Sequence, residues 1–228
     1  MNNRKLIIGD IHGCLVTFES LLNKMNFSKT DSLYLVGDYI DRGPSSKGLI
    51  DKIITLKEEG YQIVALRGNH EQMLIDNYIA EVNRGLHQVG DKAFLQSFDI
   101  RNLGDIPEKY IQFCDTLPLY HEDDEFIVVH AGLRFVYDNP FDDKEALLWT
   151  RNWYQNIDME WLGNRIVIHG HTMQSRKETE LQFLNLKTDQ VIDIDCGAVM
   201  SQSRSGLGYL CGFDFTNQEL IFQENVDY

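Results

Sequence analysis

Short apolar runs alternate with amphipathic stretches along the first part of the chain. Residues 5–8, 32–36 and 61–66 are rich in branched and aromatic side chains and predict three buried strands. Between them, apolar side chains recur at near helical spacing in residues 15–25 and 45–57, which predicts a helix after each of the first two strands. The order strand, helix, strand, helix, strand is typical of a parallel α/β unit.

The rest of the chain begins with helices and ends mainly with strands. Residues 71–82 have helical spacing, and the polar segment after them predicts a helical excursion from the core. Two apolar runs end directly before a histidine and predict strands at 126–129 and 165–168. Short turns separate the last expected strands, which cover residues 181–186, 191–194, 209–215 and 220–223.

This succession predicts an α/β fold of four layers. We expect two mixed sheets packed face to face, with helices on both outer sides. The 228 residues, of which 43% are apolar, are enough for one well-buried core. We therefore predict a single domain over residues 1–228, with residues 83–116 as a helical cap or insertion within it.

Composition narrows the classes of partner. A net charge of −14 and a pI near 4.8 argue against nucleic acid, which attracts clustered Lys and Arg. No run approaches the roughly 20 apolar residues of a membrane span, and the N-terminus lacks the apolar stretch of a signal peptide. We therefore expect a cytoplasmic protein without a membrane partner. Four cysteines, too far apart for a CxxC site and expected to be reduced, are Cys14, Cys114, Cys196 and Cys211.

Five polar motifs follow apolar runs and carry the chemistry of the chain. Aspartate, asparagine and histidine are ligands for divalent cations, and neighbouring arginines match the geometry of a phosphate group. Because ligands gather at the carboxyl ends of strands in open α/β sheets, we expect the motifs to meet in space. They are GDIHG at 9–13, GDYIDRG at 37–43, RGNHE at 67–71, HAG at 130–132 and HGHT at 169–172.

Spacing within the motifs suggests how two cations can be held. Asp10 and His12 are two residues apart, so in an extended chain both side chains face one cavity. Asp38 has two carboxylate oxygens and can bridge to a second cation, while Asn69 can add a neutral oxygen. Two later histidines can complete the second site.

The placement of histidines supports this interpretation more than the placement of glycines does. Five of the seven histidines lie at motif ends, whereas His87 and His121 lie in polar segments where we expect them to be solvated. Every motif contains a glycine beside its polar residues, but glycine is common at turns and carries little weight alone. The motif histidines are His12, His70, His130, His169 and His171.

The ordered motif series resembles that of the phosphoprotein phosphatase family of metallophosphoesterases. The resemblance spans residues 9–172 and is greatest to compact bacterial and phage serine/threonine phosphatases and to symmetrical dinucleoside tetraphosphatases. It implies the αββα sandwich of that family and a site for two metal ions. His169 matches a less constant position and is not among the implied ligands. The implied ligands are Asp10, His12 and Asp38 for one ion, and Asp38, Asn69, His130 and His171 for the other.

The same resemblance implies the catalytic residues. His70 resembles the general acid of the family, and Asp41 the carboxylate that orients it. Arg42 and Arg151 resemble the arginines that bind phosphate, and Arg67 is a weaker candidate. Two metal ions would lower the pKa of a bridging water for direct in-line attack on phosphorus.

Three functions follow, in decreasing order of expectation. The first is a protein phosphatase for phosphoserine or phosphothreonine, and the second is a symmetrical dinucleoside tetraphosphate hydrolase acting on a pyrophosphate bond. The third, a binding module that has lost turnover, is disfavoured because every ligand position holds a competent residue. The substrate is thus a phosphorylated protein or a small phosphoester, and residues 72–126, which match no motif, are where we expect specificity to arise.

Metal choice and oligomeric state are less constrained by the residues. Imidazole, carboxylate and amide ligands without thiolate fit Mn²⁺, Fe²⁺ or Zn²⁺, and the resemblance favours Mn²⁺.

Cys14 follows the first motif and is expected to be a packed small residue. Met173 stands where the family usually has proline after GHT. Nothing in the sequence predicts the number of subunits.

Overall fold

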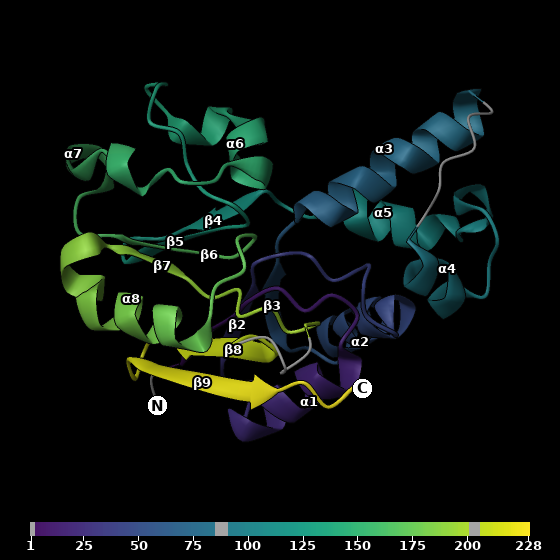
Figure 1. Ribbon diagram of the computed structural model, residues 1–228, viewed down its shortest axis with the longest axis horizontal. Helices are drawn as coiled ribbons and strands as arrows, with labels where there is room; N and C mark the ends of the chain where they lie inside the picture. The colour runs from purple at the N-terminus through teal and green to yellow at the C-terminus, as the bar shows by residue number, and fades with distance from the viewer. Residues whose placement is uncertain (1–2, 85–90, 201–205) are drawn as a thin grey trace.

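Two mixed sheets flanked by helices form the computed structural model, which describes residues 3–84, 91–200 and 206–228 (Figure 1). The first sheet has the strand order β3-β2-β1-β8-β9, with β1, β2 and β3 parallel and β8 and β9 antiparallel to their neighbours. This confirms the predicted α/β architecture. The strands are β1 (Lys5–Ile8), β2 (Ser32–Leu35), β3 (Gln62–Ala65), β8 (Tyr209–Asp214) and β9 (Glu219–Glu224).

The second sheet has the order β4-β5-β6-β7. Its last three strands are parallel, and β4 is antiparallel to β5. These strands are β4 (Tyr120–Glu122), β5 (Phe126–Val129), β6 (Ile166–His169) and β7 (Val191–Asp193).

Side-chain alternation along the strands separates the layers. In β1, Ile7 packs between the two sheets, whereas Leu6 and Ile8 face the helices on the outer side. In β5, Val128 faces the other sheet, and Val129 belongs to a separate cluster on the outer side of the second sheet. Successive residues of these apolar runs are thus buried against different layers, which explains why the runs show no polar face.

Helices cover the outer faces of both sheets. The first sheet is covered by α1 (Leu15–Lys24) and α2 (Ser46–Glu58), and the second by α6 (Lys144–Trp149) and α7 (Met159–Leu162) (Figure 1). Three short 3₁₀ helices are η1 (Leu103–Asp105), η2 (Pro140–Asp142) and η3 (Tyr154–Asn156). Within the described residues no helix is long and apolar enough to cross a membrane.

Helices also fill the segment between β3 and β4. α3 (Asn69–Arg84) begins two residues earlier than the sequence suggests, and it is followed by α4 (Lys92–Phe98) and α5 (Glu108–Thr116). These three helices lie together at one side of the molecule (Figure 1). Phe94 and Tyr110 of this segment join the same apolar cluster as Leu49 of α2, so the segment packs on the first sheet's helices.

The expected strand over residues 181–186 is wrong, because these residues lie within α8 (Arg176–Asp189). Ser175 accepts a hydrogen bond from the backbone of Glu178, and the Glu178 side chain accepts one from the backbone of Ser175. This capping box favours a helix start over an extended chain. The apolar residues of α8 form no continuous buried face, since Leu184 is 79% exposed, so helical spacing is weak in this segment.

The structure also tests what the sequence predicted for His121 and for the cysteines. His121 is half-buried and packs on Tyr34 with ring centroids 4.6 Å apart, so the prediction that it is solvated is wrong, and His87 lies outside the described residues. All four cysteines are free, as expected, and all four are buried. Burial raises the pKa of Cys14 to about 12, which makes its thiol a poor nucleophile.

Candidate metal centre and active site

The polar motifs meet where the carboxyl ends of the parallel strands come together. Asp38 follows β2 and lies against residues of three other segments: His12 after β1, His70 at the start of α3, and His130 after β5. His171 after β6 belongs to the same group of side chains. The expected convergence of the five motifs is therefore present in the fold.

Asp38 lies at the centre of two groups of potential metal ligands. One group contains His12, Asp38 and His70, and the other contains Asp38, His130 and His171, with the ligand atoms of each group within 4.8 Å of one another. Asp38 Oδ2 is 3.4 Å from Nε2 of His12, and Oδ1 is 3.4 Å from Nε2 of His130. Each carboxylate oxygen thus faces a different imidazole, which is the geometry of a bridging ligand.

Hydrogen bonds to backbone carbonyls orient two of these imidazoles. Nδ1 of His12 is 2.8 Å from the oxygen of Ile40, and Nδ1 of His130 is 3.2 Å from that of Val36. Because a carbonyl oxygen only accepts, each Nδ1 carries the proton and each Nε2 presents a lone pair. Burial lowers the pKa of His12 to about 3 and also lowers that of His130, so both rings are neutral.

The residues present fit a pair of divalent cations. The Nε2 lone pairs of His12 and His130 face the Asp38 carboxylate, an arrangement of like partial charges that a cation between them would stabilise. Asn69 Oδ1 lies 2.8 Å from Nε2 of His130, a second contact between two acceptors. His171 Nε2 is buried without a hydrogen-bond partner in the described structure.

Asp10 lies beside this centre but in neither group of ligand atoms. It is 2% exposed, and its carboxylate accepts a hydrogen bond of 3.1 Å from the backbone N–H of His171. Burial, Asp195 and Asp38 raise the pKa of Asp10, because they disfavour another negative charge. A nearby divalent cation would relieve this repulsion.

His70 and Asp41 form a close pair at the edge of the centre. Nδ1 of His70 donates to Oδ2 of Asp41 at 2.5 Å, leaving Nε2 directed away from Asp41. Burial opposes the charged imidazolium, but the hydrogen bond to Asp41 and the charge of Asp38 raise the pKa of His70. The ring is therefore suited to hold a proton and donate it.

The three candidate arginines occupy different places. Arg42 donates to Nε2 of His12 at 2.7 Å, and its other terminal nitrogen lies 3.1 Å from Nε2 of His70. Arg151 is exposed and donates to Oγ1 of Thr172, one residue beyond His171, at 3.2 Å. Arg67 instead contacts Asp115 and Gln72, and these contacts hold α3 and α5 together.

Strained backbone brings these side chains together. Ten described residues other than glycine have positive φ, and half of them belong to the predicted site. Such conformations cost about 1–3 kcal/mol each and persist only where the surroundings fix them. The five residues are His12, Asp38, Asp41, Arg42 and His171, with φ between 48° and 70°.

Glycines matter more than the sequence suggested. A Cβ added to Gly170 would lie 2.0 Å from Oδ1 of Asp10, and one added to Gly68 would lie 2.2 Å from Oδ1 of Asp38. Both distances are far below van der Waals contact, so these glycines allow the carboxylates to approach the backbone. The sequence did not indicate this role, because the spacing of glycines alone does not show which side chain will approach the backbone.

Glu71 is a site residue to which the sequence assigned no role. Its buried carboxylate accepts backbone hydrogen bonds from Gly68 at 2.9 Å, Asp38 at 2.9 Å and Tyr39 at 2.8 Å. Burial and the neighbouring Asp38 raise the pKa of Glu71 to about 7, while the backbone donors favour its charged form. Glu71 thus joins the loops that carry Asp38 and Asn69. The sequence signal that could have identified it is its position in the RGNHE motif.

Glu71→Gln should lower the free energy of unfolding by about 2–3 kcal/mol, because an amide N–H would face backbone donors in a buried place. Denaturant titration should show a lower midpoint with an unchanged slope. Glu58→Gln, at an exposed position in α2, is the matched control and should leave the midpoint nearly unchanged. Equal midpoints for the two variants would show that Glu71 does not hold these loops.

Another polar group lies next to the centre, around His169. Nε2 of His169 accepts from the hydroxyl of Tyr154 at 2.6 Å, and its Nδ1 donates to the oxygen of Gly170 at 2.9 Å. Both ring nitrogens are therefore occupied, and His169 belongs to neither ligand group. Asp193 and Asp195 are buried nearby on β7 and after it, in a segment where the sequence showed no recognisable motif.

Comparison with known proteins agrees with this geometry. The sequence profile of the calcineurin-like phosphoesterases matches residues 4–187. An asymmetrical bis(5'-nucleosyl)-tetraphosphatase, PrpE of Bacillus cereus, is 30% identical over 89% of both chains, and a PrpE of Bacillus thuringiensis is 28% identical over the same shares.

Solved structures show the same fold at lower identity. A putative diadenosine tetraphosphatase superposes with a TM-score of 0.66 at 22% identity, covering 99% of this chain and 95% of its own. A serine/threonine phosphatase of Saccharomyces cerevisiae superposes with a TM-score of 0.64 at 16% identity, covering 100% and 81%. With the family profile spanning most of the sequence and His and Asp side chains grouped for a binuclear centre, the chain belongs to the calcineurin-like phosphoesterases and is a metal-dependent phosphoesterase.

Proposed function

We propose that this phosphoesterase hydrolyses dinucleoside polyphosphates asymmetrically, splitting a dinucleoside tetraphosphate into a nucleoside triphosphate and a nucleoside monophosphate. The observation that carries the proposal is the 30% identity, over 89% of both chains, to a relative named for that activity. The sequence alone favoured a protein phosphatase and, second, symmetrical cleavage. Relatedness over nearly the whole length changes that order, because the motifs are common to both kinds of enzyme.

Within this proposal, six side chains hold two divalent cations. When bound, the cations would activate water and neutralise charge on the phosphoryl oxygens. Oxygen and imidazole ligands without thiolate fit Mn²⁺ first, with Fe²⁺ and Zn²⁺ as alternatives. One ion would be held by Asp10, His12 and Asp38, and the other by Asp38, Asn69, His130 and His171.

The remaining residues act on the substrate itself. His70, oriented by Asp41, donates a proton from Nε2 to the departing oxygen. Arg42, which contacts His12, and Arg151, which contacts Thr172, offer charge-assisted hydrogen bonds to phosphate oxygens. A chain of net charge −14 thereby presents cations at the point where an anionic substrate must bind.

Hydrolysis of phosphoserine or phosphothreonine in proteins is the second candidate. The ordered motifs from GDIHG to HGHT and the His70–Asp41 pair favour it, since a serine alkoxide is a poor leaving group that needs an acid.

A substrate comparison tests the proposal. The Mn²⁺-loaded chain should cleave diadenosine tetraphosphate to ATP and AMP with a higher kcat/KM than it shows for phosphoserine peptides. Two equivalents of ADP would indicate symmetrical cleavage, and faster turnover of peptides would favour the second candidate. A metal-loaded protein inert towards an aryl phosphate as well would instead indicate a binding module.

A further inference from the structure

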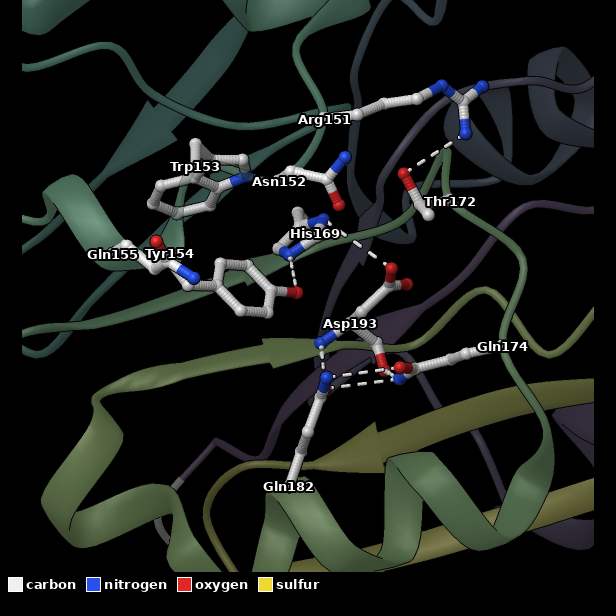
Figure 2. Close-up of a pocket in the computed structure, with 10 residues that line it drawn as sticks. All are labelled: Arg151, Asn152, Trp153, Tyr154, Gln155, His169, Thr172, Gln174, Gln182 and Asp193. Carbon is white, nitrogen blue, oxygen red and sulfur yellow. Dashed lines mark hydrogen bonds and ion pairs between the residues drawn. The ribbon is translucent and has the colours of Figure 1, made fainter.

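A cavity of about 240 Å³ lies next to the candidate metal centre, since Thr172, which follows His171, is among its lining residues. Figure 2 shows the side chains that line it. Arg151 and Thr172 line one end of it, and these two side chains are joined by a hydrogen bond of 3.2 Å. From there it extends between the loop after α6, the end of β6 and the end of β7. A ligand whose phosphate contacts Arg151 would therefore place its neighbouring group in this cavity.

The size of the cavity limits what that group can be. Sites for drug-sized ligands have volumes of about 300–1,000 Å³, so a volume near 240 Å³ suits one ring system and not a whole nucleotide. A serine or threonine phosphoester carries no ring next to its phosphate and would leave the cavity unfilled.

Two aromatic side chains form fixed walls. Trp153 is 5% exposed and donates its indole N–H to the oxygen of Ala131, while the Tyr154 hydroxyl donates to His169. The two rings meet edge to face with centroids 5.1 Å apart. Their polar atoms are already bonded. Trp153 fixes the wall from behind, and the half-buried Tyr154 presents a ring surface that suits stacking with a flat heterocycle.

Asp193 supplies a buried acceptor in the cavity wall. Its side chain is 2% exposed, and Oδ1 accepts from the backbone N–H of Asp195 at 2.9 Å. Oδ2 is 3.9 Å from Nδ1 of His169, too far for a hydrogen bond, and that nitrogen donates to Gly170 instead. Oδ2 is therefore open to a donor from a ligand.

The amides around the cavity divide into committed and available groups. Gln174 and Gln182 bond to each other at 3.0 and 3.1 Å and to the backbone of Asp193, which fixes that wall. Gln155, which is exposed, makes no side-chain hydrogen bond within the described ranges. It can turn to meet the edge of a ring.

We propose that this cavity binds the nucleobase of a nucleotide whose α-phosphate contacts Arg151. The inference rests on the proposed function and adds the place where the nucleoside is recognised. A nucleobase combines a flat face that can stack on Tyr154 with N–H groups that can donate to Asp193. Because the base would lie directly beyond Arg151, the phosphate nearest the metal centre is the one attached to that nucleoside, which leads to release of a nucleoside monophosphate.

Competition between two phosphate monoesters tests the proposal. AMP and ribose 5-phosphate share a sugar phosphate and differ by the base, and their inhibition constants can be measured against p-nitrophenyl phosphate hydrolysis by the Mn²⁺-loaded chain. We expect AMP to bind about tenfold more tightly, the effect of stacking one base on aromatic side chains. Asp193→Asn, which places an N–H where an acceptor stood, and Gln155→Ala should each bring the ratio of the two constants towards one.

Asn156→Ala is the matched control, because Asn156 is exposed and adjacent in sequence but does not line the cavity, and it should keep the ratio of the wild-type chain. Equal constants for AMP and ribose 5-phosphate in the wild-type chain, or an unchanged ratio in both cavity variants, would overturn the inference. If Asp193→Asn also weakens the binding of ribose 5-phosphate, its effect is structural. The ratio measured for Gln155→Ala then decides whether the cavity binds the base. If the enzyme binds AMP more tightly than ribose 5-phosphate but cleaves phosphopeptides faster than dinucleotides, the proposed function is refuted. The assignment of the cavity as a nucleobase site then still holds.

Discussion

Asp38→Asn should remove nearly all turnover of an aryl phosphate and at least one of the two metal ions. Asn retains the shape and tolerates the positive φ of 53° found at this position, so the substitution isolates the loss of charge. Only a carboxylate presents two charged oxygens to two cations. Because a metal pair supplies several kcal/mol of transition-state stabilisation, we expect kcat/KM to fall by more than about a thousandfold.

Elemental analysis under saturating Mn²⁺ and initial-rate measurements check this result together. Asp124→Asn serves as the control, because Asp124 is exposed in the turn between β4 and β5, at the opposite end of β5 from His130, and its replacement should leave both values unchanged. Two full equivalents of metal in Asp38→Asn, with activity near that of the unaltered chain, would contradict the role of Asp38 as the shared ligand.

The polar residues of the centre were predictable from the sequence, because they lie in the loops just after the strands. β1, β2, β5 and β6 were recognisable as short runs of branched apolar residues, and parallel strands bring their carboxyl ends together. Asp38 needed no further information, since it follows β2 within the GDYIDRG motif.

Other parts of the site depend on contacts that no local pattern reveals. Asp193 belongs to a three-residue strand without a motif, and Tyr154 lies in a single 3₁₀ turn. Their relation to His169 arises only when β6 and β7 pair and the loop after α6 folds back. α8 differs, because its local signal is the capping box of Ser175 and Glu178, while its apolar residues form no continuous buried face.

His70→Asn should separate proton donation from metal binding. Without the imidazolium, hydrolysis of an alkyl phosphate should slow by about 10²- to 10⁴-fold, the usual contribution of a general acid. p-Nitrophenyl phosphate should be much less affected, because nitrophenolate departs without a proton. Asp41→Asn should act in the same direction with a smaller effect, since it weakens the orientation of His70 and leaves the ring in place.

The dependence on pH gives the distinguishing measurement for His70. Asp41 and Asp38 raise its pKa against the effect of burial, so the acid form is present at low pH and is lost as pH rises through that raised value. The rate for the alkyl phosphate should therefore fall on the alkaline side, and this fall should be absent in His70→Asn. Because His70 also lies within reach of His12 and Asp38, metal content must be measured in the same samples. A loss of metal in His70→Asn that matches its loss of activity would identify His70 as a ligand, and the acid role would then be refuted.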